Sequence, residues 1–406
     1  MKNILVVGGG FAGVWSAAGA VRAARENGIP ESELQVTLVS SGDDMVMRPR
    51  LYEADPEKMR VPLDRILGPI GVRRVAATVT HIDTAARSVT ATGRHGRTDT
   101  ISYDRLVLAT GSQLVQPKLP GAQRMFDVDT LPAAAALEYH LQRLPEAEPR
   151  QGRFTAVVVG AGFTGVEAAT EIGGRLKAVA DAWDCTDPVR VVLVERADVV
   201  GPELGPGPRP HIESALESLG VEQRLGRTVE SLTEHEVRLS DGEVIPAATV
   251  VWTAGQTASP LTAFIPGERD RLGRLHVDEF LRVVGTSDVY AAGDTAAAMA
   301  EEGNTVTQSC QHAMPLGRFA GHNVVADLHG LTQVPFAPEP YGTGLDLGPT
   351  GALISMGWDR KVQLTGQAAK ETKVMINTQL IYPPIDDADA LLAQADHNAK
   401  PVGEVV

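Results

Sequence analysis

The sequence contains only two cysteines, Cys185 and Cys310, and they lie far apart in the chain. Two cysteines cannot build a disulfide framework, an iron–sulfur cluster or a cysteine-based zinc site. Their separation also excludes a CxxC or CxxxxC pair, so the chain lacks the dithiol that many redox enzymes use. No metal site is expected.

Basic residues and long apolar runs are also scarce. Lys and Arg number 37 against 51 Asp and Glu, which gives a net charge of −14. This charge disfavours nucleic acid or an anionic membrane surface as a partner. No apolar run approaches the ~20 residues of a membrane span, and a strand beginning at Asn3 or Ile4 leaves no room for a signal peptide. We therefore expect a cytoplasmic protein with no integral membrane segment, in an oligomeric state that the sequence leaves open.

Glycine, in contrast, is abundant and forms two copies of one loop. Each copy follows a short apolar run and precedes a helix-like pattern of small residues. The copies consist of Gly8, Gly10, Phe11, Ala12 and Gly13, and of Gly160, Gly162, Phe163, Thr164 and Gly165. In such a strand–turn–helix unit the glycines allow a tight turn, close approach of a pyrophosphate and close helix packing. The helix N-terminus then offers free N–H groups to the phosphates, so two copies predict two bound dinucleotides.

Each loop begins a longer pattern that the chain repeats. Both halves continue with a helix, an apolar strand, an alternating turn-rich segment near 78–101 or 226–246, and a final strand. This order predicts an α/β fold with two Rossmann-like nucleotide-binding domains, parallel sheets and antiparallel meanders, plus a small C-terminal α+β domain. The expected domains are residues 1–115 with 257–330, residues 116–256, and residues 331–406.

Polar residues at strand ends are candidate nucleotide contacts. Glu195 ends the strand after the second loop, where a carboxylate can accept both ribose hydroxyls and repel a 2′-phosphate. The sequence therefore favours NADH over NADPH, although the adjacent Arg196 can pair with such a phosphate. The corresponding residue of the first half is Ser40, which leaves that ribose contact open. Asp294, after Gly293, can either hold a polyol chain or cap a helix.

Together these motifs resemble the two-dinucleotide-binding flavoproteins, the pyridine nucleotide–disulfide oxidoreductases in the broad sense, over roughly residues 1–328. The resemblance implies FAD on the first loop and NAD(P)H on the second. It implies further cofactor contacts from Ser40, Val79, Ala109, Thr110, Gly111, Gly293, Asp294 and Ala313 for FAD, and from Glu195 and Gly255 for the nicotinamide nucleotide.

Within this superfamily the second loop, with Glu167, is most similar to type II NADH dehydrogenases and apoptosis-inducing-factor-like quinone reductases. The likeness implies that Gln311 and His312 lie beside the flavin, and it makes these two residues and Glu167 the catalytic candidates. Glu167 can equally be an acid favoured at a helix N-terminus, and His312 a core histidine. The implied activity passes hydride from NADH to FAD and then two electrons to a soluble quinone-like or other small acceptor.

Two other functions stay open. The segment Met47–Glu53 is similar to part of the ferredoxin reductases of oxygenase systems, which makes Arg48 a cofactor-binding candidate and an electron-transfer protein the partner. The acidic chain would repel an acidic ferredoxin unless a local basic patch compensates. The other function is a redox-sensing flavoprotein, which would turn over slowly with every acceptor.

Overall fold

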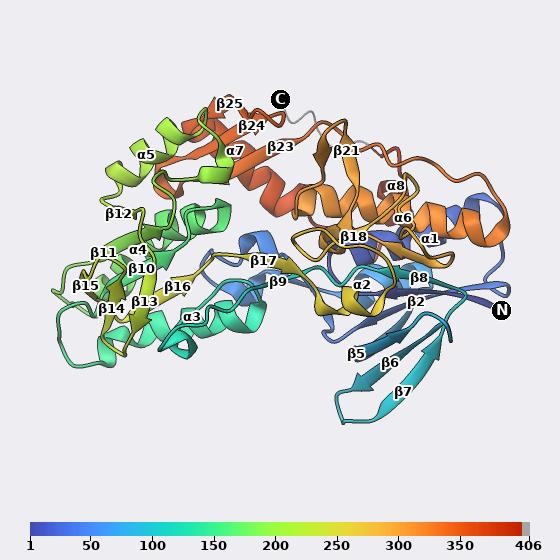
Figure 1. The fold of residues 1–406 in the computed structure, drawn as a ribbon, viewed down its shortest axis with the longest axis horizontal. Coiled ribbons are helices and arrows are strands. Elements are labelled where there is room, and N and C mark those ends of the chain that lie inside the picture. Colours follow the sequence, from blue (N-terminus) through green and yellow to red (C-terminus); the bar gives the residue numbers. More distant parts are fainter. Residues whose placement is uncertain (400–406) are drawn as a thin grey trace.

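The computed structural model describes residues 1–399 and places a parallel sheet in each of two lobes (Figure 1). Their central strands are Val- and Leu-rich and buried on both faces, as parallel strands between helices must be. The first sheet contains, in spatial order, β19 (Val289–Ala291), β8 (Arg105–Leu108), β1 (Lys2–Val7), β2 (Leu34–Ser40), β5 (Arg73–Asp83), β6 (Ser88–Gly93) and β7 (Thr98–Ser102). The second contains β12 (Glu222–Leu225), β11 (Arg190–Glu195), β10 (Thr155–Val159) and β16 (Thr249–Trp252). The predicted fold class is confirmed.

The long strand β5 joins two kinds of pairing in one sheet. Its first residues pair in parallel with β2, and the rest pair antiparallel with β6, where Ala77 lies opposite Gly93. The first predicted meander is therefore an extension of the first sheet. The second predicted meander is a separate antiparallel sheet of β13 (Val229–Leu232), β14 (Glu236–Leu239) and β15 (Val244–Pro246).

Helices cover these sheets, and two of them pack with unusually close backbones. The helices are α1 (Phe11–Glu26), α2 (Leu63–Leu67), α3 (Leu131–Arg143), α4 (Phe163–Ala182), α5 (Arg209–Ser218), α6 (Cys310–His329), α7 (Gly366–Met375) and α8 (Ala388–Gln394). A Cβ added to Gly317 of α6 would lie 2.6 Å from the carbonyl oxygen of Ala12, and one on Gly321 would clash with that of Ser16. The missing side chains of these two glycines thus let α6 approach α1 and the first glycine loop.

The C-terminal segment forms a third, smaller unit that packs against α4 (Figure 1). It contains an antiparallel sheet of β23 (Gly342–Asp346), β24 (Ala352–Met356) and β25 (Lys361–Thr365), followed by α7 and a π-helical turn, Ile376–Leu380. This agrees with the predicted α+β composition. The domain boundaries stay a prediction, and the end of the predicted third domain, residues 400–406, lies outside the described residues.

Four short strand pairs complete the structure. They are β3 (Asp44–Val46) with β4 (Arg60–Pro62), β9 (Ser112–Leu114) with β17 (Gln256–Ala258), β18 (Leu275–His276) with β20 (Ala296–Ala297), and β21 (Met299–Glu301) with β22 (Asn304–Thr305). The β9–β17 pair links the two lobes, because each strand directly follows the last strand of one half (Figure 1). Within residues 1–399, no helix is both long and apolar enough to cross a membrane.

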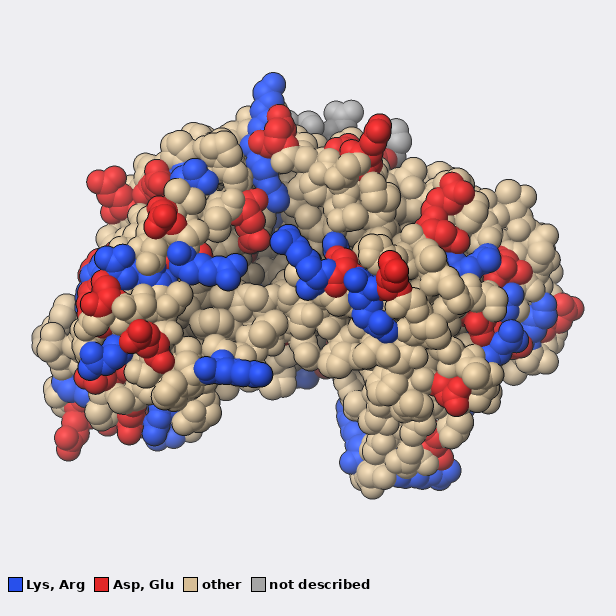
Figure 2. Space-filling model, in the orientation of Figure 1, with Lys and Arg blue, Asp and Glu red and all other residues tan. Residues whose placement is uncertain are grey.

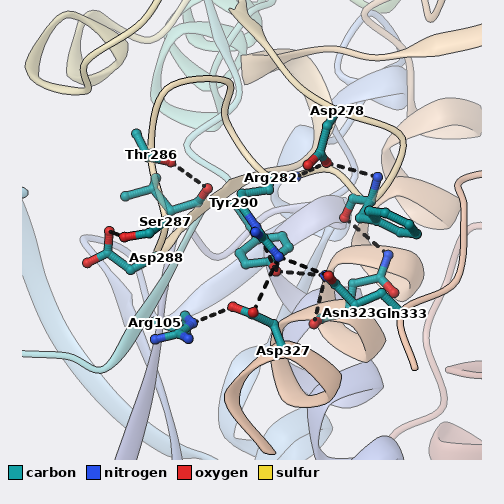
Figure 3. A network of polar contacts seen from close by, with 12 residues as sticks. Arg105, Asp278, Arg282, Thr286, Ser287, Asp288, Tyr290, Asn323, Asp327 and Gln333 are labelled. Atoms are coloured by element: carbon teal, nitrogen blue, oxygen red, sulfur yellow. Dashed lines mark hydrogen bonds and ion pairs between the residues drawn. The ribbon is translucent and has the colours of Figure 1, made fainter. Parts of the chain in front are cut away.

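A network of polar contacts holds the C-terminal part of α6 against the first sheet (Figure 3). Asp327 of α6 accepts hydrogen bonds from Arg105 Nε at 2.5 Å and from Arg282 Nη2 at 3.3 Å. The amide of Gln333 accepts from Arg282 at 2.9 Å and donates to the Tyr290 hydroxyl at 2.8 Å. The network ties α6 to strands β8 and β19 and holds the start of the chain segment that follows α6.

That segment, residues 333–340, has no helix or strand of its own and depends on side chains for its position. The fully buried Asn323 donates to the carbonyl oxygen of Val334 at 2.8 Å and accepts from its amide at 2.8 Å. At the other end, the Gln311 amide group lies against the backbone of Gly342. The segment is therefore anchored at both of its ends, and several of its residues line the cavity described next.

Candidate functional site

A single continuous cavity of about 2040 Å³ lies between the lobes and reaches both glycine loops. Ordinary small-molecule sites occupy about 300–1,000 Å³, so this cavity has room for more than one such ligand. All but five of the predicted site residues line it: Gly8, Gly10, Phe11, Ala12, Ser40, Arg48, Ala109, Thr110, Gly111, Gly162, Phe163, Thr164, Glu167, Gly255, Gly293, Asp294, Gln311, His312 and Ala313.

Three of the remaining five are glycines that shape the loops from behind. A Cβ on Gly13 would clash with the carbonyl oxygen of Gly8, and one on Gly165 with that of Gly160. Gly160 also has a φ of 103°, a conformation that favours glycine. These residues set the backbone path, while Gly10 has open space where a Cβ would be. The glycines therefore shape both loops as their spacing predicts, and the binding of nucleotides by the loops stays a prediction.

The fourth residue, Val79, is not among the cavity-lining residues. It lies on β5 opposite Ala91 and is buried in the apolar core beneath the first sheet. The FAD contact implied for Val79 therefore stays a prediction.

The wall beside the first loop is charged. Asp294 accepts from the Ser112 hydroxyl at 2.7 Å and lies 3.6 Å from Arg48 Nη1. Arg48 donates to the same Ser112 hydroxyl at 2.9 Å and forms an ion pair with Asp129. Burial raises the pKa of Asp294. Asp129 was missed in the sequence, because it belongs to the connection between the lobes and carries no recognisable motif.

An unsatisfied hydroxyl completes this wall. The buried Oγ1 of Thr110 finds no hydrogen-bond partner within residues 1–399. Ser40, at the end of β2, places its Oγ 2.5 Å from where a Cβ of Gly9 would be. Buried polar groups are nearly always bonded, so an unpartnered hydroxyl lining a cavity indicates a polar ligand there.

Beside the second loop, Glu195 is the fifth predicted residue that does not line the cavity. It ends β11 as expected, but its carboxylate accepts from the backbone amides of Ala161 at 2.7 Å and Ala197 at 2.9 Å. A carboxylate has about four acceptor positions, so each oxygen can still accept one more bond. The ribose contact stays a prediction.

Glu167 forms a buried ion pair across two units of the fold. Its carboxylate lies 2.9 Å from Lys373 Nζ of α7 and accepts from the amide of Asp346 at 3.0 Å, while Lys373 also donates to the carbonyl of Gly344 at 2.9 Å. Each side chain of the pair is only 9% exposed. Burial raises the pKa of Glu167; burial opposes the charge on Lys373, but the carboxylate raises its pKa. Lys373 gave no signal in the sequence.

His312 lies on the first turn of α6, stacked among aromatic rings. Its ring centroid is 5.1 Å from that of Tyr341 and 6.1 Å from that of Trp358. The Nδ1 atom accepts from the amide of Thr307 at 3.1 Å. Burial lowers the pKa of His312 to about 4, so its ring is neutral at physiological pH. His312 is a buried histidine that also lines the cavity, and its place beside the flavin stays a prediction.

Basic groups are enriched in the cavity relative to the chain. Seven Lys or Arg side chains and six Asp or Glu side chains line it, whereas the whole chain has 37 against 51. Figure 2 shows such basic side chains around the hollow between the lobes. This local charge favours anionic ligands such as dinucleotides. No cluster of His, Cys, Asp and Glu able to hold a metal ion occurs in residues 1–399.

Comparisons with known proteins agree with this geometry. Residues 2–317 match the family described as pyridine nucleotide-disulphide oxidoreductase. An NADH dehydrogenase-like protein of Mycobacterium tuberculosis is 46% identical over 404 residues, 99% of this chain and 100% of that protein. Demethylphylloquinone reductase NdbB of Synechocystis is 30% identical over 94% of this chain and 91% of its own length. The solved structure of NDH2 from Plasmodium falciparum in complex with NADH superposes with a TM-score of 0.78 at 14% identity. The match covers 94% of this chain and 95% of that one, and it indicates a shared fold.

Proposed function

The chain belongs to the pyridine nucleotide-disulphide oxidoreductase family and is an oxidoreductase, and we propose that it passes electrons from NADH through FAD to a small quinone-like acceptor. The observation that most supports the proposal is the continuous cavity that joins both glycine loops. One cavity lets two nucleotides meet without a dithiol between them, which fits a chain with two separated cysteines.

The residues beside the first loop fit FAD. The open space at Gly10 and the N-terminal amides of α1 suit a pyrophosphate. Asp294, Arg48 and the unpartnered Thr110 hydroxyl supply the polar groups that a ribityl chain and phosphates require. When bound, FAD supplies a ring that accepts a hydride and later releases two electrons. The amides that begin α6 would favour negative charge next to that ring.

The second loop fits NADH. Glu195 keeps free acceptor positions at the end of β11, where ribose hydroxyls can donate to it, and a 2′-phosphate would meet its negative charge. Gly255 and Thr253 line the opposite edge, where the Thr253 hydroxyl donates to the carbonyl oxygen of Val159 at 2.9 Å. These residues would orient the nicotinamide toward the centre of the cavity.

The acceptor side is apolar and is formed mainly by the C-terminal unit. It is lined by Tyr341, Ile354, Met356, Ile376, Leu380 and Ile381. Such a lining suits an uncharged ring compound more than a highly charged one. Two relatives carry quinone reductase names, demethylphylloquinone reductase and type II NADH:quinone oxidoreductase, and this supports a quinone as the acceptor class.

Reduction of a quinone by NADH also consumes one proton from solution. Glu167 is the group that this chain can offer for it, because it lines the cavity and burial raises its pKa. Lys373 opposes this rise in pKa, because its ammonium group favours the charged carboxylate. His312, with a pKa of about 4, would not carry the second ring proton of an imidazolium near neutral pH and so could not donate it.

Steady-state assays with a panel of acceptors test this proposal. We expect rapid NADH oxidation with soluble quinones, and slower oxidation when NADPH replaces NADH. Equally slow turnover with every acceptor would instead favour a redox sensor. Fast reduction of a ferredoxin but not of quinones would favour the ferredoxin reductase function.

A further inference from the structure

Arg360 has a strained backbone conformation that glycine would adopt more easily. It lies in the turn between β24 and β25 with a φ of 56°, in the left-handed region. Non-glycine residues in this region cost free energy of the order of 1 kcal/mol or more, and such strain often occurs at functional sites. Gly357 of the same turn shows that the chain can place glycine here. The arginine side chain therefore needs an explanation.

The guanidinium group of Arg360 is held between two aromatic rings. Its central carbon lies 5.1 Å from the ring centroid of Phe163 and 4.9 Å from that of Tyr341. One nitrogen donates to the Tyr341 hydroxyl at 2.9 Å. Within residues 1–399, no carboxylate lies within ion-pair distance of Arg360. Since a guanidinium has five N–H donors, several remain available to a ligand.

The location of this group is specific. Phe163 is the first residue of α4 and directly follows Gly162 of the second glycine loop. Arg360 lines the same cavity as both residues, although it comes from a different unit of the fold. The N-terminal amides of α4 and the guanidinium thus approach one region from two sides.

An acidic side chain now lies in that region. A Cβ on Gly162 would clash with Oε1 of Glu203, so this carboxylate occupies the space in front of the loop. At the first loop the equivalent space next to Gly10 is open. Glu203 is exposed on a short glycine- and proline-rich segment and can turn away into solvent. An anion therefore already lies in front of the second loop, close to a helix N-terminus that favours negative charge.

We propose that Arg360 binds the pyrophosphate of the nicotinamide nucleotide, and that this nucleotide displaces Glu203 from Gly162. The inference rests on the proposed function, because it assigns a new contact to the NADH site. A planar guanidinium pairs with phosphate oxygens through two parallel hydrogen bonds, and the two rings hold it ready for this geometry. The C-terminal unit thereby contributes to nucleotide binding as well as to the acceptor side.

Calorimetric titration of the flavin-loaded protein with ADP-ribose tests the proposal. ADP-ribose carries the pyrophosphate but cannot transfer hydride, so the readout is binding and not turnover. We expect Arg360→Gln to weaken binding about tenfold, the ratio that ~1.4 kcal/mol produces. Arg360→Lys should weaken it less, because it keeps the charge but loses the planar fork. Glu203→Gln should tighten it.

Arg238→Gln is the matched control, since this exposed arginine of β14 does not line the cavity and its loss changes the net charge equally. Its affinity should equal that of the unchanged protein. Flavin content and unfolding temperature identify any variant that fails to fold. ADP-ribose binding by both Arg360 variants at the unchanged affinity would overturn the inference. Failure of the unchanged protein to bind ADP-ribose or to be reduced by NADH would instead overturn the proposed function.

Discussion

Replacing Lys373 with methionine tests the buried ion pair with Glu167. Both side chains are 9% exposed and 2.9 Å apart, so the substitution leaves a carboxylate that neither water nor a cation stabilises. Breaking such a pair costs about 3–5 kcal/mol of folding free energy. We expect a loss of about 3 kcal/mol near pH 8, because Glu167 keeps its hydrogen bond from the Asp346 amide. Urea unfolding followed by tryptophan fluorescence, with excess FAD, measures this loss.

The loss should depend on pH with a defined sign. Burial already raises the pKa of Glu167, and removing Lys373 raises it further. Because the folded pKa then lies above the unfolded one, the penalty is absent below the unfolded value and grows as pH rises toward the folded value. Near pH 5 the substitution should therefore reduce the free energy of unfolding by less than it does near pH 8. The double variant Glu167→Gln/Lys373→Met should recover most of the stability, since no charge remains. The two charges do not depend on each other if the single variant loses under about 1 kcal/mol of unfolding free energy at pH 8. A double variant that is no more stable than the single variant would lead to the same conclusion.

Three further predictions concern the nucleotide sites. Glu195→Gln should weaken NADH binding by about 1.5–3 kcal/mol and leave NADPH binding nearly unchanged, as titration of the oxidised protein with each nucleotide would measure; equal losses for both would contradict the ribose contact. Gly10→Ala should fold normally, because its Cβ enters open space, but it should retain less flavin, because that space is the proposed pyrophosphate site. Gly13→Ala should reduce the unfolding temperature through a clash with the carbonyl oxygen of Gly8; equal unfolding temperatures for the two variants would contradict this distinction. His312→Gln should leave the pH profile of turnover unchanged between about pH 5.5 and 8, because the pKa of His312 is about 4 and the ring stays neutral there; a shifted profile would show that the ring titrates.

The parts of the site that are local in sequence could be predicted from it. The glycine loops follow directly from a strand–turn–helix pattern, and Asp294 follows from a strand end. Both kinds of signal lie within about ten residues, so no tertiary information is needed. The repeated order of helices and strands predicted two Rossmann-like units for the same reason. The continuity of β5 with both β2 and β6 was not predicted, because strand pairing is a long-range property.

The remaining site residues come from distant segments and carry no motif. Lys373 reaches Glu167 from 206 positions away, the difference between the two residue numbers. Arg360 lies in a hairpin turn, where its left-handed backbone becomes visible only in the structure. Asp129 and Glu203 stand in connecting segments whose course the sequence does not reveal.

If the two glycine loops hold FAD and NADH in one cavity, NADH should reduce the bound flavin directly. Anaerobic titration of the purified protein with NADH, followed through the yellow absorbance of the flavin, measures this reduction. We expect one FAD per chain and complete bleaching by one equivalent of NADH, with a slower response to NADPH. A colourless protein, or a flavin that NADH does not reduce, would show that the loops do not hold this pair of nucleotides.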